Sequence, residues 1–228
     1  MLGPIRTASS TLRALHIDSL LSHAGVNPSA SAARGLSPSI DPSTTFERAG
    51  DNSFPGGHIY SRMSNPTRAN LESAVAGLEV AGSDLTATGS AFSSGMAAVN
   101  GVIMAAQSLD NKPAHLLLPD DCYHGVPSQL VQALANTSSN VTWQLVDMTD
   151  ESAVTAALAS RPTARNTVLW LETPSNPLCK VSPIASLAAA AKAVGEDVIV
   201  VVDSTWAPPN LTQPLRLGAD VVVHSATK

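Results

Sequence analysis

The chain has 228 residues, of which 44% are hydrophobic and 14% charged, and its net charge at pH 7 is −5. This length can form one large domain, with or without an arm before it. The sequence offers no basic patch for a nucleic acid and no apolar run long enough to cross a membrane. Cys122 and Cys179 lie far apart, which argues against a disulfide framework or a zinc motif and favours a reducing compartment such as the cytoplasm.

The first part of the chain, residues 1–68, is rich in Ser, Pro, Gly and Thr and shows little periodicity, which predicts an extended, loop-rich arm. Its first segment, Met1–Leu15, carries two arginines and several hydroxyl residues but no acid. This composition fits either an organelle transit peptide or an ordinary disordered N-terminus.

From Ala69 onward, short apolar β-branched runs alternate with amphipathic segments. This alternation predicts an α/β domain over residues 69–228, with a mostly parallel sheet covered by helices on both faces. We expect helices over residues 69–80, 96–108, 126–135, 150–159 and 184–194. We expect strands over residues 84–88, 115–119, 141–146, 168–171, 198–202 and 221–223.

Ligands of open parallel sheets bind beyond the carboxyl ends of the strands, so the residues that follow each predicted strand are site candidates. A small-residue run, Gly89–Met96, opens a helix and could bind an anion, although such runs often serve only as caps. Tyr123, the stiff loop from Glu172 to Pro177, Asp203 and Lys228 follow other predicted strands. Each has an ordinary structural explanation when taken alone: packing, a rigid turn, a helix cap or a frayed terminus.

Together these residues match the parts of pyridoxal 5′-phosphate (PLP): a phosphate, a ring face, a ring nitrogen and an aldehyde. A lysine at the end of a buried strand should be desolvated, which favours the neutral amine that bonds to an aldehyde. The sequence therefore predicts a PLP site formed around Asp203 and Lys228.

Four blocks carry a resemblance to a known family. They are Tyr60–Arg68 (YSRMSNPTR), Ser94–Ala98 (SGMAA), Glu172–Pro177 (ETPSNP) and Val223–Lys228 (VHSATK). In order and spacing, the chain resembles the cystathionine γ-synthase, γ-lyase and β-lyase family of PLP enzymes of Cys/Met metabolism. The resemblance implies PLP fold type I, with a large domain like that of aspartate aminotransferase, and a carbon–sulfur lyase or transferase of transsulfuration.

The resemblance also implies a role for each matching residue. Lys228 would bond to the cofactor and later shuttle protons, Asp203 would pair with the ring nitrogen beside Thr205, and Tyr123 would stack on the ring and assist elimination. Asn176 would contact the ring hydroxyl. The phosphate would be bound by Gly95, Met96, Ser225 and Thr227, and by Tyr60 and Arg62 from a neighbouring subunit of a dimer or tetramer.

Two departures from the family pattern limit these expectations. Asp203 is followed by Ser204, Thr205 and Trp206 where the family has a DNTF-type run, which leaves the subfamily open. We also expect the family's C-terminal small domain, with its substrate-binding arginine, to be absent, so that the chain alone has little or no activity. A non-catalytic truncated paralogue and a fold-related aminotransferase remain as alternatives.

Overall fold

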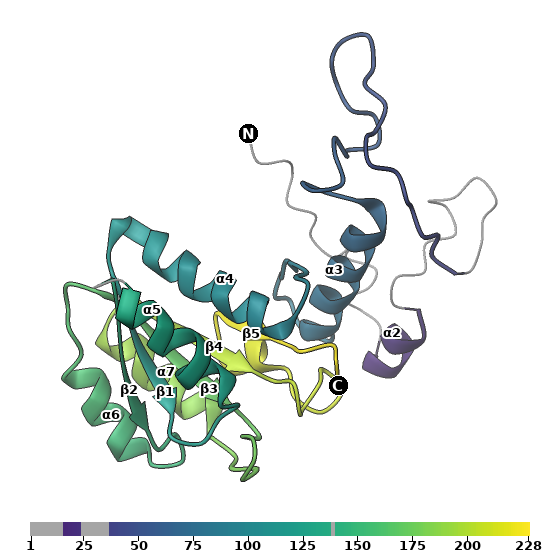
Figure 1. The fold of residues 1–228 in the computed structure, drawn as a ribbon. Coiled ribbons are helices and arrows are strands. Elements are labelled where there is room, and N and C mark those ends of the chain that lie inside the picture. Colours follow the sequence, from purple (N-terminus) through teal and green to yellow (C-terminus); the bar gives the residue numbers. More distant parts are fainter. Residues whose placement is uncertain (1–15, 24–36, 138–139) are drawn as a thin grey trace. The chain divides into compact units, whose positions relative to one another are not determined.

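The computed structural model describes residues 16–23, 37–137 and 140–228, and residue contacts divide the chain into two compact units, Met1–Ala91 and Phe92–Lys228 (Figure 1). The transit-like segment over residues 1–15 lies outside the described residues. The predicted domain boundary at residue 68 falls inside a helix of the first unit. No helix in the described ranges has the length and apolarity to cross a bilayer.

The first unit contains helix α2 (Ile17–His23), which the sequence analysis did not anticipate, and helix α3 (Pro66–Glu79). Between residues 37 and 65 the backbone forms no helix, and its only strand-like feature is an isolated antiparallel bridge between Thr45 and Tyr60. The loop-rich character predicted for the arm is therefore present over residues 37–65, whereas residues 17–23 are helical.

The start of α3 explains part of the Tyr60–Arg68 block. Asn65 is the N-cap, its side chain accepting a hydrogen bond from Thr67 N (2.9 Å), and Pro66 occupies the first turn, where no backbone donor is needed. Arg68 donates to the carbonyl oxygens of Ser61 (3.2 Å) and Met63 (2.6 Å). Arg68 thus links the turn that contains Ser61 and Met63 to the first turn of α3.

The second unit contains a five-stranded sheet in the order β2-β1-β3-β4-β5. Every neighbouring pair of strands is parallel, as predicted. The strands are β1 (Ala114–Pro119), β2 (Val141–Val146), β3 (Asn166–Glu172), β4 (Val198–Asp203) and β5 (Val221–Val223). Because the chain passes from β1 to β2 on one side and then returns to β3 on the other, the strand order reverses between β1 and β3.

Helices cover both faces of this sheet (Figure 1). One face carries α4 (Gly95–Ser108), the π-helical η3 (Gly125–Val131) and α5 (Gln132–Thr137). The other carries α6 (Glu151–Ala159) and α7 (Ile184–Val194). Two short 3₁₀ turns, η2 (Leu109–Asn111) and η4 (Pro214–Leu217), complete the unit.

Two hydrophobic clusters lie on opposite faces of the central strands. On β3, Val168 and Trp170 pack toward the α4 side, whereas Leu169 and Leu171 pack toward α6 and α7. All four side chains are fully buried. Since successive side chains of a strand point to opposite faces, Glu172 follows Trp170 on the α4 side. Buried clusters on both faces are the reason that the strands read as continuous apolar runs.

Two predicted elements differ from the structure. The strand expected over residues 84–88 is absent: this segment has no regular secondary structure, and Leu85 is exposed. The helix expected over residues 126–135 begins as the π-helix η3 and becomes α-helical only at Gln132.

Candidate functional site

A cavity of about 280 Å³ lies at the carboxyl edge of the sheet, lined from the strand ends and from the start of α4. The lining includes all the second-unit residues that the sequence analysis singled out. Those expected at the ring or the aldehyde are Tyr123, Asn176, Asp203, Thr205 and Lys228. Asp203 and Lys228 therefore open onto one cavity, as a PLP site requires.

The residues expected at the phosphate, Gly95, Met96, Ser225 and Thr227, line the same cavity. The Ser94 hydroxyl accepts a hydrogen bond from Ala97 N (3.1 Å) and so caps α4, whose first N–H groups are at the positive end of the helix dipole. A Cβ atom on Gly95 would approach Ser225 Cβ to 3.0 Å. The glycine is needed because the loop after β5 passes so close to the start of the helix.

The loop after β4 is held by its own side chains. Asp203 Oδ1 accepts a hydrogen bond from Thr205 N (3.0 Å), and Thr205 Oγ1 accepts one from Ser225 N (2.9 Å). Within the same loop, the buried Ser204 hydroxyl donates to Ala207 O (2.7 Å). This chain of contacts ties Asp203 to the loop that carries Lys228.

The loop after β1 presents Tyr123, whose side chain is partly exposed, with its ring centroid 5.0 Å from that of His124. The neighbouring Cys122 is buried, and desolvation, together with Glu172, Asp121 and Asp203, raises the pKa of its thiol to about 12. Cys122 is therefore a neutral packing residue of this loop rather than a nucleophile.

The expected desolvation of Lys228 is wrong for this chain. Strand β5 ends at Val223, and the turn that follows leaves the Lys228 side chain exposed at the cavity. Lys228 lines the same cavity as Asp203.

Tyr60 and Arg62 belong to the first unit, where the Arg62 guanidinium lies 4.9 Å from the centroid of the Tyr60 ring. The remaining lining residues had no individual role in the sequence-based expectations; they are Ser94, Val99, Val126, Glu172 and Trp206. Glu172 and Ser94 nevertheless lie in two stretches that the sequence marked as site candidates, the loop from Glu172 to Pro177 and the run Gly89–Met96. Nothing in the sequence indicated that Trp206 would line the site.

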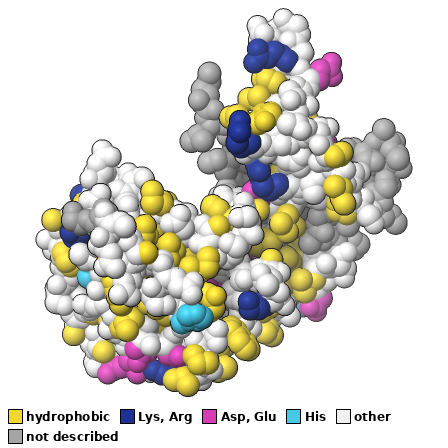
Figure 2. Space-filling model, in the orientation of Figure 1, with side chains coloured by type: hydrophobic (Ala, Val, Ile, Leu, Met, Phe, Trp, Pro, Cys, Tyr) yellow, Lys and Arg dark blue, Asp and Glu magenta, His cyan; other side chains and the backbone are white. Residues whose placement is uncertain are grey.

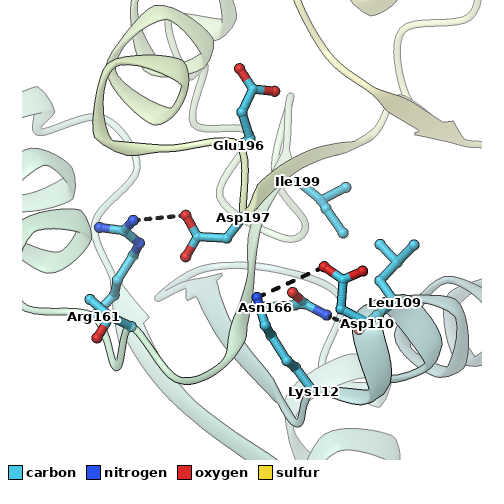
Figure 3. Close-up of a pocket in the computed structure, with 9 residues that line it drawn as sticks. Leu109, Asp110, Lys112, Arg161, Asn166, Glu196, Asp197 and Ile199 are labelled. Carbon is cyan, nitrogen blue, oxygen red and sulfur yellow. Dashed lines mark hydrogen bonds and ion pairs between the residues drawn. The ribbon is translucent and has the colours of Figure 1, made fainter.

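A larger hollow, about 580 Å³, lies at the opposite, amino edge of the sheet (Figure 3). Four of its five charged groups form two pairs: Arg161 Nη2 lies 2.9 Å from Asp197 Oδ1, and Lys112 Nζ lies 3.8 Å from Asp110 Oδ2. Ligands of parallel sheets bind at the carboxyl edge. The smaller cavity is therefore the candidate functional site.

On the face shown in Figure 2, the Lys and Arg side chains of the second unit lie in small separate groups, one of them beside acidic side chains at the lower edge of the view. Within the described ranges, no cluster of His, Cys, Asp or Glu could hold a metal ion.

A family model for Cys/Met metabolism PLP-dependent enzymes matches residues 18–228. The chain belongs to this family. Cystathionine beta-lyase of Coxiella burnetii is 38% identical over 216 residues, covering 93% of the chain and 50% of that protein. Cystathionine gamma-synthase of Mycobacterium tuberculosis (strain H37Rv) is 39% identical over 208 residues, covering 90% and 49%.

Solved structures of family members share the fold. MetB from Corynebacterium glutamicum superposes with a TM-score of 0.82 at 33% identity, covering 95% of this chain and 52% of that one. Cystathionine gamma synthase from Xanthomonas oryzae pv. oryzae, solved in complex with cystathionine, gives 0.81 at 34% identity, covering 94% and 51%. The chain thus spans about half the length of the relatives it matches, and the predicted α/β fold and family are confirmed.

Proposed function

We propose that the chain binds PLP in the carboxyl-edge cavity and that its protein forms or cleaves carbon–sulfur bonds in sulfur amino acids. One observation carries the proposal: an acid, an aromatic ring, an amine and a helix start with a glycine cradle surround a single cavity of about 280 Å³. These groups suit the parts of PLP, and the family to which the chain belongs uses this cofactor.

When bound, PLP supplies an aldehyde that holds an amino group and a ring that withdraws electrons from the bonds of the substrate's α-carbon. Lys228 Nζ would hold the aldehyde and, once displaced by substrate, carry a proton from the α-carbon. Asp203 would keep the ring nitrogen protonated. The N–H groups of Gly95 and Met96, with the hydroxyls of Ser225 and Thr227, would bind the phosphate.

Tyr123 would lie against the ring and assist departure of the leaving group, and Asn176 would contact the ring hydroxyl. Tyr60 and Arg62 would bind the phosphate of a neighbouring subunit, so that the working assembly is a dimer or tetramer. The substrate would be cystathionine, homocysteine, cysteine or an activated homoserine ester, and the reaction a β- or γ-elimination or a γ-replacement. The relatives' names include both a lyase and a synthase.

Borohydride reduction of the PLP-loaded chain, followed by peptide mapping, tests the cofactor site. We expect one labelled lysine, Lys228, among the four in the chain. A Lys228→Ala variant should lose the label, whereas Lys180→Ala, whose side chain pairs with Asp120 (3.0 Å), should keep it. Labelling spread over several lysines, or retained in Lys228→Ala, would contradict the proposal.

A second candidate is a non-catalytic protein that binds PLP or a full-length partner without turnover. The chain spans about half the length of each relative that it matches. Release of thiol and keto acid when the PLP-loaded chain is incubated with cystathionine would rule out this second candidate, because that release requires catalysis.

A further inference from the structure

Glu172, the last residue of β3, is a buried carboxylate with three close backbone contacts, and only 4% of its surface is exposed. Tyr123 N donates to both of its oxygens, at 3.1 Å to Oε1 and 2.9 Å to Oε2. Asn176 N donates to Oε1 at 2.9 Å. We call this set of contacts the carboxylate bridge.

The carboxylate bridge spans the place where the strand order reverses. Tyr123 follows β1 and Asn176 follows β3, which are neighbours in the sheet although β2 and α6 lie between them in the sequence. Both residues line the cavity. One carboxylate therefore fixes the backbone of two cavity residues that belong to separate loops.

A second link between the same loops runs in the opposite direction. Asp121, from the loop after β1, accepts hydrogen bonds from Ser175 Oγ and from Leu178 N (3.1 Å) in the loop after β3. Asp121 is buried, but it does not line the cavity. Two acids therefore link these loops: Glu172, which lines the cavity, and Asp121, which does not.

In its ionised form the carboxyl group suits the bridge, because it then only accepts hydrogen bonds. Both oxygens of Glu172 face backbone donors, so a glutamine would place its own N–H₂ group against one of them. Burial raises the pKa of Glu172 to about 7, an effect that its bonds to the N–H groups of Tyr123 and Asn176 oppose and that Asp203 reinforces. Burial of a carboxylate costs free energy. Here the two N–H groups that the carboxylate positions also hydrogen-bond to it, and these bonds offset part of that cost.

We infer that Glu172 is a positioning residue for the cofactor: through the backbone of Tyr123 and Asn176, it holds the two loops that present these side chains to the cavity. The inference rests on the proposed PLP site. It assigns to Glu172 no contact with substrate and no proton transfer, only control over where the aromatic ring and the amide lie.

The test compares the full chain with Glu172→Gln and with Glu151→Gln, a matched change at an exposed position in the first turn of α6. Amide hydrogen exchange of Tyr123 and Asn176 is measured without cofactor, and PLP affinity and the circular dichroism of bound PLP are measured with it. We expect Glu172→Gln to speed exchange of at least one of the two amides by about tenfold, to weaken PLP binding by about tenfold and to change the dichroism of bound PLP. Glu151→Gln should leave all three unchanged.

The outcomes separate this inference from the proposed function. Failure of the wild-type chain to bind PLP overturns the proposed function. Normal PLP binding by the wild type with unaltered exchange, affinity and dichroism in Glu172→Gln overturns the positioning role alone. Should Glu172→Gln fail to fold, the amide proton shifts of Tyr123 and Asn176 in the wild type must titrate together, because one carboxyl group binds both; separate titrations overturn the inference.

Discussion

At the scale of single residues, Gly125 decides where the Tyr123 ring can lie. A Cβ atom at position 125 would come within 2.6 Å of Tyr123 Cε1. Gly125 has no left-handed backbone conformation, so the lack of a side chain there serves the ring and not the turn. The loop after β1 therefore contains both Tyr123 and the glycine that leaves room for its ring.

A Gly125→Ala variant should fold but displace the Tyr123 ring and weaken PLP binding by up to roughly tenfold, the range expected for one aromatic contact. Fluorescence titration with PLP measures the effect. In a Tyr123→Ala background the same change should have no further effect, because the displaced ring is absent. An equal loss in both backgrounds would show that Gly125 acts by another route.

Residue-level sequence reasoning found site residues that lie at the end of a strand or in the loop after it. Tyr123, Asp203 and Lys228 were identified because a parallel sheet brings the residues after its strands to one edge. The positioning role of Glu172 could not be predicted. Its hydrogen-bond partners are backbone amides, one of them 49 residues away in sequence, and a sequence pattern does not show which backbone N–H groups will face a side chain. The solvent exposure of Lys228 could not be predicted from the sequence either, because it depends on the turn after β5.

At the scale of elements, the starts of α4 and α6 are a natural pair for comparison. Both helices have a side-chain N-cap, Ser94 for α4 and Asp150 for α6, but only Ser94 lines the cavity. The Asp150 carboxylate accepts from Ser152 N (2.9 Å) and Ala153 N (3.2 Å). Removal of either cap should loosen the first turn of its helix.

We expect Ser94→Ala to lower the free energy of unfolding by roughly 0.5–2 kcal/mol and to weaken PLP binding, since the first turn of α4 also supplies the phosphate's N–H donors. Asp150→Ala should lower stability without changing PLP affinity. Urea unfolding and PLP titration of both variants check this pair. Equal losses of affinity would mean that helix capping affects the cavity only through overall stability.

Sequence patterns identified elements best where burial dominates. The runs that became β1, β3 and β4 are buried on both faces, so their apolar character was unambiguous. Residues 84–88 alternate apolar and polar side chains like a half-buried strand, but they pair with no strand in the structure. Strand identity depends on a partner elsewhere in the chain, which a local pattern does not contain.

At the scale of the whole molecule, the ionisation of Glu172 should make stability depend on pH. Burial raises its pKa from 4.5 to about 7. Below pH 4.5 the carboxyl group is protonated in both the folded and unfolded states. Between pH 4.5 and 7 the unfolded chain releases this proton and the folded chain keeps it, so this contribution to stability falls as pH rises.

The expected loss across that window is roughly 3 kcal/mol at most, and it should be missing from Glu172→Gln. Urea unfolding of the cofactor-free wild type and variant at pH 5 and pH 7 measures the difference. The pKa of Asp197 is lowered by its bond to Arg161, so its contribution is lost only as pH falls through the acidic range and stays constant in this window. Identical pH slopes in the two proteins would contradict the prediction.

The register of the sheet places Glu172 opposite Asp203, at the ends of two adjacent parallel strands. Two acids side by side repel each other whenever both are ionised, and Asp203 is one of the groups that raise the pKa of Glu172. A ligand that carries a positive charge, such as a protonated ring nitrogen, would reduce this repulsion when it binds. Binding and stability would then be coupled. The repulsion in the empty cavity would favour binding of the positively charged ligand, and the ligand-bound protein would have a larger free energy of unfolding than the ligand-free protein.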